Sequence, residues 1–333
     1  MPALPIFNII TLPGNVLRCR WPVRACILWA NLLNNAPPQG ERRHMKGLGK
    51  LGVWIAPDAL SATQIAELAQ GVEKLNFDVF WYPEGVGFET FSFGGFVLAE
   101  TDRLRAASGI ANIYARDAVT ARAGHDTLNA LYEDRFIMGL GVSHIPLVEG
   151  FRGHGYGKPL TTMRTYLDAI DATELGIPAP ERNIILAALG PKMTALGGER
   201  TRGAHSYNVT PEHTANARKI LGPDAWLCVE QKICLTKDAS VARGIASDVL
   251  ELYLPWPNYR NNWLNLGFSE EELTGRGSAR FLDAMVASGN ADDVRARIKA
   301  HLDAGASHVC VQPLNPDGTA APDWRALEAI AAA

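Results

Sequence analysis

Several features that mark common classes of protein are missing from this sequence of 333 residues. Its 5 cysteines form no CxxC pair and no cysteine–histidine ligand spacing, and no HExxH motif is present, so no metal site is predicted. No uncharged apolar run is long enough to span a membrane. The formal net charge is -3 and no basic cluster contains interleaved aromatic residues, which argues against a nucleic-acid partner. The cysteine usage fits a reducing intracellular compartment best, so we expect a cytoplasmic protein.

The first 44 residues differ in composition from the rest of the chain. They hold five arginines, six prolines and one acidic residue, Glu41, and they show no amphipathic period. A targeting peptide is one interpretation, but Arg18, Arg20 and Arg24 interrupt any apolar stretch that could serve as its core. We expect residues 1–44 to be an extension outside the fold, with the true start at Met45, and residues 45–333 to form one domain.

Strand-like and helical segments alternate through the remaining chain. The strand-like segments are KLGVWIAP, FDVFWYPE, LRAASGIANIY, RFIMGLGVSH, ERNIILAALG, GAHSYNV, AWLCVEQKICLT and HVCVQPL. Eight such units predict an α/β fold of the (β/α)8 TIM-barrel type, which needs about 250 residues, with insertion loops at its carboxyl face. An open doubly wound sheet is the alternative. It usually carries a GxGxxG motif after its first strand, where Ala56-Pro57-Asp58 stand here.

The segment from Leu104 to His144 contains one complete strand, helix, strand unit, and two strands joined by one crossover helix must be parallel. Asp117 is a suitable helix N-cap. Apolar residues recur near a 3.6-residue period at Val119, Ala123, Leu128 and Leu131. The same period predicts that Arg122 and Asp126 lie on the exposed face of this helix.

Polar residues follow three successive strands, at the end of the barrel where active sites lie. Glu84 ends the second strand, as a catalytic carboxylate or as a salt-bridged loop residue. Asn112 ends the third among apolar neighbours, where its carboxamide must find partners. Ser143 and His144 end the fourth strand. His144 fits an acid or base, a phosphate donor or a capped loop residue.

Two further segments have the composition of ligand-binding loops. Gly190, Pro191 and Lys192 open a helix, where free N–H groups and the lysine charge favour phosphate. The glycines of FRGHGYGKP do not form a P-loop, because Pro159 follows Lys158 where serine or threonine is required. This stretch is a lid over the barrel mouth or an ordinary loop.

The motifs FWYPE, SGIANIYARDA, DRFIMGLGVSH, ALGPKM, AHSYNVTPEHT and GASHVCVQPL occur in this order along the chain. In order and spacing, the chain from Met45 onward resembles the luciferase-like monooxygenase superfamily, and within it the branch that uses the deazaflavin coenzyme F420. The resemblance implies a barrel with a flavin-like ring at its mouth and the phosphate tail on the later loops.

The resemblance also assigns residues to this cofactor. It implies a cis peptide between Gly109 and Ile110, with Ile110 against the ring and Asn112 at the ring edge. It places the phosphate and ribityl part of the cofactor on the residues that end the fourth strand and open the fifth helix, namely Ser143, His144, Gly190, Pro191 and Lys192. Glu84 stands where relatives place groups for proton transfer. Some relatives that oxidise alcohols have an Asp-His pair where Pro83-Glu84-Gly85 stand here, so the resemblance does not supply their hydride donor.

The function implied by the resemblance is hydride transfer between F420 and a small organic substrate, with Glu84 and His144 as catalytic residues and a homodimer as the assembly. An FMN-dependent monooxygenase of the same fold is the first alternative. A flavin-binding protein without turnover is the second, since no clear acid/base pair can be read from the sequence.

Overall fold

The computed structural model describes residues 8–12, 15–19, 47–177 and 180–331. The chain divides into two units, Met1–Lys46 and Gly47–Ala333. In the first unit, β1 (Asn8–Leu12) and β2 (Asn15–Cys19) pair in antiparallel fashion. The rest of the predicted extension, and Met45 itself, lie outside the described residues, so the proposed start of translation stays a prediction.

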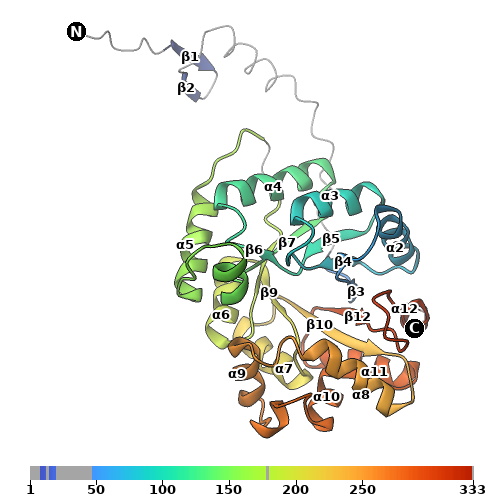
Figure 1. Cartoon of the computed structure of the whole chain (residues 1–333). Helices are drawn as coiled ribbons and strands as arrows, with labels where there is room; N and C mark the ends of the chain where they lie inside the picture. Colours follow the sequence, from blue (N-terminus) through green and yellow to red (C-terminus); the bar gives the residue numbers. More distant parts are fainter. Residues whose placement is uncertain (1–7, 13–14, 20–46, 178–179, 332–333) are drawn as a thin grey trace. The chain divides into compact units, whose positions relative to one another are not determined.

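The second unit is a closed barrel of eight parallel strands (Figure 1). Its strands in ring order are β3 (Leu51–Trp54), β4 (Val79–Tyr82), β5 (Arg105–Ser108), β7 (Phe136–Gly141), β8 (Ile184–Ala187), β9 (Gly203–Ser206), β10 (Trp226–Cys234) and β12 (His308–Pro313). Pairing of β12 with β3 and of β10 with β9 closes the ring. Closure confirms the predicted (β/α)8 barrel and excludes the open doubly wound sheet.

Helices surround this ring and follow the predicted alternation with the strands. They are α2 (Ala62–Lys74), α3 (Thr90–Ala99), α4 (Ala118–Leu131), α5 (Pro159–Ala172), α6 (Pro191–Arg200), α7 (Pro211–Leu221), α8 (Ala239–Leu250), α9 (Pro257–Asn265), α10 (Ala279–Met285), α11 (Ala291–Asp303) and α12 (Trp324–Ala331). Caps define several helix starts: Ser61 forms a capping box on α2, and Asp117 accepts a hydrogen bond from the Thr120 N–H of α4, as predicted.

The predicted orientation of α4 is wrong in part, although Leu128 is 7% exposed and therefore buried as predicted. Arg122 and Asp126 are 5% and 1% exposed, whereas Val119 and Leu131 are 54% and 68% exposed. The charged side chains face inward because they neutralise one another: the Arg122 Nε donates to Asp126 Oδ2 at 2.6 Å, and the other carboxylate oxygen lies 2.7 Å from His125 Nδ1. Buried charges are tolerated when they are paired and hydrogen-bonded in this way.

Side chains along the barrel strands alternate between the helices and the interior. Trp81, His205 and His308 fill the lower interior, where the Trp81 indole stacks on His205 with ring centroids 4.7 Å apart and donates to His308 Nε2 at 3.0 Å. Gly52 leaves the space that His308 occupies, since a Cβ at Gly52 would lie 2.5 Å from His308 Nε2. The interior is therefore packed below the mouth.

The segment that follows β10 is an insertion with its own core. Between β10 and α11 it contains α8, α9, the 3-10 helix η2 (Glu271–Leu273), α10 and a short strand, β11 (Val286–Ser288), which was not predicted and pairs with β10 outside the ring. The buried side chains of this core include Leu250, Tyr259, Trp263, Phe268 and Phe281. The insertion is thus anchored to the barrel at its seventh strand.

Candidate active site

The third strand is interrupted by a bulge at the mouth of the barrel. The peptide bond between Gly109 and Ile110 is cis, which confirms this part of the prediction, and a short strand, β6 (Ala111–Asn112), follows it. Two glycines of β7 make room for the bulge: a Cβ at Gly141 would lie 2.4 Å from Ile110 Cδ1, and one at Gly139 would lie 2.2 Å from the Ser108 carbonyl oxygen. Ile110 itself is partly exposed.

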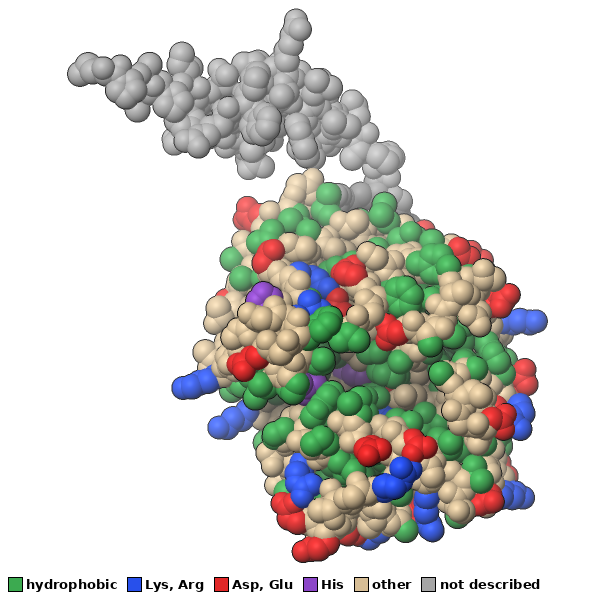
Figure 2. Space-filling model, viewed as in Figure 1, with side chains coloured by type: hydrophobic (Ala, Val, Ile, Leu, Met, Phe, Trp, Pro, Cys, Tyr) green, Lys and Arg blue, Asp and Glu red, His purple; other side chains and the backbone are tan. Residues whose placement is uncertain are grey.

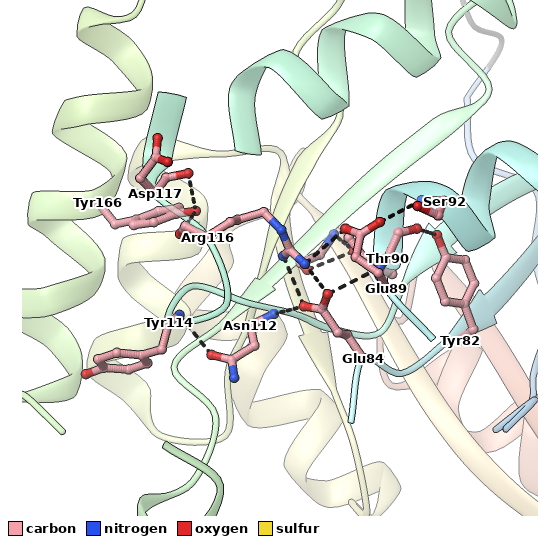
Figure 3. A network of polar contacts seen from close by, with 12 residues as sticks. Tyr82, Glu84, Glu89, Thr90, Ser92, Asn112, Tyr114, Arg116, Asp117 and Tyr166 are labelled. Carbon is pink, nitrogen blue, oxygen red and sulfur yellow. Dashed lines mark hydrogen bonds and ion pairs between the residues drawn. The ribbon is translucent and has the colours of Figure 1, made fainter. Parts of the chain in front are cut away.

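Glu84 lies directly beside this bulge in a network of charged groups (Figure 3). Its carboxylate forms an ion pair with Arg116, and the two side chains are 3% and 8% exposed. The Asn112 N–H donates to Glu84 Oε2 at 2.8 Å, and the Thr90 N–H donates to Oε1 at 3.2 Å. Both carboxylate oxygens are therefore engaged in holding the bulge and the start of α3.

Arg116 joins Glu84 to a second acid. Its Nη2 lies 3.1 Å from Glu89 Oε1, on a carboxylate that also caps α3 by accepting the Ser92 N–H at 2.8 Å. The carboxylates of Glu84 and Glu89 raise the pKa of Arg116, although its burial opposes this. The Arg116 guanidinium thus stays charged and links the loop after β4 to the segment after β6.

Asn112 is 2% exposed, and the two ends of its side chain differ. Its Oδ1 accepts the Tyr114 N–H at 2.9 Å, which fixes the carboxamide. Among the described residues no partner is found for its Nδ2 group. The Asn112 Nδ2 group is therefore an unpaired hydrogen-bond donor beside the bulge, which is what a contact to a ligand requires.

Ser143 and His144 lie just after β7. Ser143 has a positive φ of 55°, and its carbonyl oxygen accepts a hydrogen bond from the Tyr156 hydroxyl at 3.3 Å. The His144 ring packs on Trp256 with centroids 4.0 Å apart. Burial lowers the pKa of His144 to about 4, so its imidazole is neutral at pH 7 and can donate one hydrogen bond and accept another.

The stretch FRGHGYGKP follows a π-helical segment, η1 (Pro146–Phe151), and is tied to the barrel by hydrogen bonds. The Gly157 N–H donates to the Tyr114 hydroxyl at 2.9 Å, and the Tyr156 N–H donates to Glu149 Oε1 at 3.0 Å. The Tyr114 and Tyr156 rings also stack at 5.7 Å. Whether this stretch acts as a lid stays a prediction, but it lies against the segment that carries Asn112.

Gly190, Pro191 and Lys192 form the start of α6 at the end of β8, and all three are exposed. No side chain caps this helix, and the space around the Gly190 Cα is open, because an added Cβ would meet no atom within 4 Å. The free N–H groups and the Lys192 ammonium are therefore available to an anion.

The structure thus brings the predicted residues to the ends of four strands that are neighbours in the ring, β4, β5, β7 and β8. Glu84 and Asn112 are in direct contact. Whether these residues bind a cofactor or act in catalysis stays a prediction.

Sequence reasoning missed the polar groups on the opposite side of the mouth. Lys232, 1% exposed on β10, donates from Nζ to Asn208 Oδ1 at 2.5 Å and lies 3.2 Å from Glu230 Oε1. Its ammonium also lies 3.8 Å from the centroid of the Tyr207 ring. The alternation of charged and apolar residues in CVEQKIC could have indicated that Glu230 and Lys232 point to one side, but not that this side is the barrel interior.

A chain of contacts joins this ion pair to the bulge. The Tyr207 ring lies 5.0 Å from the Trp54 ring, and the Trp54 indole N–H donates to the Gly109 carbonyl oxygen at 3.3 Å. The Tyr207 hydroxyl donates to Gln312 Oε1 at 3.0 Å. The mouth is therefore a continuous surface from the bulge to β10.

Space-filling representation shows a hollow in the middle of one face, bordered mainly by hydrophobic side chains with histidine visible at its floor (Figure 2). Within the described residues, no group of three or more histidine, cysteine, aspartate or glutamate side chains could hold a metal ion. No helix in the same residues has the length and apolar character needed to cross a membrane.

A closed parallel barrel with polar groups gathered at the carboxyl ends of its strands defines the (β/α)8 class, whose active sites lie at this end. The chain belongs to the luciferase-like monooxygenase family, which residues 43–308 match.

Two relatives are similar in sequence. A putative coenzyme F420-dependent oxidoreductase of Mycobacterium tuberculosis is 29% identical over 151 residues, which cover 44% of this chain and 43% of that relative. The 5,10-methylenetetrahydromethanopterin reductase of Methanolobus tindarius is 23% identical over 299 residues, 76% of this chain and 91% of that enzyme. The chain therefore matches less than half the length of the first relative and most of the second.

Solved structures share the fold. The coenzyme F420-dependent tetrahydromethanopterin reductase of Methanopyrus kandleri superposes with a TM-score of 0.64 at 16% identity, over 86% of this chain and 98% of that one. The oxygenating constituent of 3,6-diketocamphane monooxygenase of Pseudomonas putida, a type II Baeyer-Villiger enzyme in complex with FMN, gives 0.64 at 14% identity over 85% and 96%. At these identities the likeness concerns the fold alone.

Proposed function

We propose that this protein is an oxidoreductase that transfers hydride between the deazaflavin coenzyme F420 and a small organic substrate. Family membership supports an enzyme of this type, and F420 is named for the mycobacterial relative and for the Methanopyrus reductase. The observation that carries the proposal is the bulge at the barrel mouth, where a partly exposed Ile110 lies next to the unpaired Nδ2 group of Asn112.

The residues present fit such a cofactor. A planar, hydrogen-bonding ring system needs an apolar surface and a polar edge contact, which Ile110 and Asn112 offer side by side. A phosphate-bearing tail needs uncompensated N–H groups and positive charge, which the uncapped start of α6 and Lys192 offer. The bound cofactor would supply a two-electron hydride carrier.

The side chains around it would orient the ring and manage one proton. Ile110 would contact the ring face and Asn112 would donate to the ring edge, while Ser143, His144 and the turn from Gly190 to Lys192 would hold the tail. Since both Glu84 oxygens are occupied, we propose that Glu84 positions Asn112, in place of the proton transfer expected from sequence. Burial lowers the pKa of His144 to about 4, so its imidazole is neutral at pH 7, and the catalytic role expected for it from the sequence stays a prediction.

Titration of the purified protein with F420 and with FMN, followed by fluorescence quenching of the cofactor, tests the proposal. We expect F420 to bind at least about tenfold more tightly than FMN. Tighter binding of FMN would refute F420 as the cofactor, and binding of neither would refute the enzyme function. A Lys192→Ala variant should weaken F420 binding, whereas Lys219→Ala, which removes an exposed lysine from α7, should leave it unchanged.

The second candidate is an FMN-dependent monooxygenase, since the FMN-bound Pseudomonas enzyme has the same fold. Tighter FMN binding together with oxygen consumption in the presence of reduced FMN would support it. Binding without turnover of any carbonyl or alcohol substrate would instead point to the non-catalytic flavin-binding protein.

We further propose that the enzyme works as a homodimer in the cytoplasm. The buried thiols Cys228, Cys234 and Cys310 are free, in keeping with a reducing compartment. Light scattering coupled to size-exclusion chromatography measures the assembly, and a monomer at micromolar concentration would contradict the dimer.

A further inference from the structure

Five aromatic rings gather at the mouth, beginning at His144, which also borders the proposed tail site. We call them the aromatic wall: His144 after β7, Tyr207 after β9, Tyr253 and Trp256 between α8 and α9, and Tyr259 in α9. Neighbouring ring centroids are close, at 4.0 Å for His144 and Trp256, 5.4 Å for Trp256 and Tyr253, and 5.6 Å for Tyr253 and Tyr207. All except Tyr259 are partly exposed, so ring surface is accessible from the mouth.

The wall begins beside the bulge. Tyr207 is 5.0 Å from Trp54, whose indole N–H is bonded to the Gly109 carbonyl oxygen. A molecule that reaches the Tyr207 end of the wall would therefore lie near the bulge, on the surface where the proposed function places the reacting ring. The aromatic wall is thus in the right place for a second reactant.

The wall carries no net charge at neutral pH. The Lys232 ammonium lies behind the Tyr207 ring, where Glu230 and Asn208 neutralise and hold it, and it is 1% exposed. The depressed pKa of His144 keeps that imidazole neutral. The adjoining residues on the rim, Ile145 and Leu252, are hydrophobic and 52% and 57% exposed. A charged ligand would lose its hydration here without gaining an opposite charge.

Among the polar groups of the wall, the Tyr207 and Tyr253 hydroxyls lie in contact with each other. The Tyr207 hydroxyl donates to Gln312, and the Tyr253 hydroxyl lies 3.2 Å from the Tyr207 oxygen, the longer of the two contacts. The Tyr253 proton is therefore the one that can turn to another acceptor. A carbonyl oxygen is such an acceptor, and a carbonyl carbon is also a hydride acceptor.

We propose that the aromatic wall is the substrate subsite and that its ligand is an uncharged, planar, π-rich carbonyl compound. The ligand stacks on the Trp256 ring and accepts a hydrogen bond from the hydroxyl of Tyr253, whose ring stands at 82° to that of Trp256. This inference rests on the proposed hydride transfer. In the reductive direction, the bound cofactor would supply a hydride to the carbonyl carbon, the carbonyl π-electrons would move to oxygen, and that oxygen would take one proton from the Tyr253 hydroxyl. The ring N–H proton that the cofactor gives up on oxidation would restore the Tyr253 hydroxyl through solvent. The oxidised deazaflavin and an alcohol are the products.

Calorimetric binding of 2-acetonaphthone to the full chain tests the subsite without turnover. The matched probes are 2-naphthoate, which keeps the ring and adds charge, and cyclohexyl methyl ketone, which keeps the carbonyl and lacks π-electrons. We expect 2-acetonaphthone to bind at least about tenfold more tightly than either probe. Equal or tighter binding of 2-naphthoate, or equal binding of the cyclohexyl ketone, would overturn the proposal.

Variants locate the site on the wall. Trp256→Leu should weaken 2-acetonaphthone binding about tenfold. Tyr253→Phe should weaken binding of this ketone but not of naphthalene, which has no acceptor. The control is Trp324→Leu on α12, which removes an exposed tryptophan that lies against Gly71 of α2. Equal losses in the Trp256 and Trp324 variants, or equal loss of both ligands in Tyr253→Phe, would overturn the proposal.

The same titrations separate this proposal from the proposed function. Binding of 2-acetonaphthone in a protein that binds neither F420 nor FMN would leave the subsite standing and remove the reaction. Binding of F420 without any preference for the aromatic ketone would remove the subsite and leave the reaction. Thermal unfolding of each variant establishes that the chain is folded in every comparison.

Discussion

Replacing Glu84 by glutamine would test how the bulge at the barrel mouth is held. The Glu84 carboxylate accepts from the Thr90 N–H and Arg116 Nη2 on one oxygen, and from the Asn112 N–H and Arg116 Nη1 on the other. A glutamine keeps one oxygen and places an NH2 group at the other position. Whichever way the amide turns, two donors lose their acceptor and a buried guanidinium loses its nearest opposite charge.

The size of the effect follows from burial. Removing one partner of a buried ion pair destabilises a protein by about 3–5 kcal/mol. Glu89 remains 3.1 Å from Arg116 and supplies part of the lost charge, so we expect about 3 kcal/mol for Glu84→Gln. Glu89→Gln is the matched control, because Glu89 touches the same guanidinium but is 46% exposed. Its loss should be about 1 kcal/mol, from a surface pair and a helix cap.

Urea unfolding at pH 7, followed by circular dichroism, measures both losses. F420 titration of the folded variants adds a second measurement, since a loosened Asn112 should weaken cofactor binding. If Glu84 transferred a proton, as first predicted, Glu84→Gln would keep its stability and its affinity and lose only turnover. Equal losses of stability for Glu84→Gln and Glu89→Gln would refute the positioning role.

Three further predictions follow from packing and charge. Gly141→Ala should displace Ile110, because the new Cβ would lie 2.4 Å from its Cδ1, and should weaken F420 binding about tenfold. The control, Gly244→Ala, has open space at its Cβ and should leave F420 binding unchanged. Equal F420 affinities of the two variants would contradict the packing argument. Lys232→Met should destabilise the protein by about 3–5 kcal/mol at pH 7 in urea unfolding. This loss of stability should become smaller toward pH 4, since burial raises the pKa of Glu230 and the protonated carboxyl needs no charged partner. A loss of stability that does not change with pH would contradict this reasoning. The NMR resonances of the His144 ring, assigned by comparison with a His144→Gln variant, should titrate near pH 4. Between about pH 6.5 and pH 4 the imidazole binds a proton in the unfolded state but not in the folded state, so His144 lowers the stability of the protein as the pH falls through this range. A titration midpoint near 6.5 would disprove the burial of His144.

The barrel could be predicted from sequence because each parallel strand is a compact apolar run followed by a helix. Strand ends then located Glu84, Asn112 and His144 at the mouth. The partner of Glu84 could not be read, since Arg116 lies 32 residues away and only folding brings the two together. The prediction that Arg122 and Asp126 are exposed on α4 was wrong for a related reason. The periodicity places the two residues on the same face of the helix, but it does not reveal that they form an ion pair in the protein interior.

The residues at the mouth opposite the bulge could not be predicted from the sequence for a different reason. Glu230 and Lys232 occur in an ordinary strand, and their charges suggest a solvent-facing edge until closure of the ring turns them inward. Tyr253 and Trp256 lie in a connection without periodicity, where no pattern predicts which side chains converge. Long-range closure, rather than local propensity, determines this half of the site.

The segment between β10 and α11 has a hydrophobic core of its own and contributes three of the five rings of the aromatic wall, Tyr253, Trp256 and Tyr259. The barrel strands meanwhile carry the bulge and the groups around it. With the proposed roles, most of the substrate surface and the whole cofactor surface come from different parts of one gene. Exchanging this segment as a cassette that keeps Tyr253 would offer a route to new specificities on the same barrel.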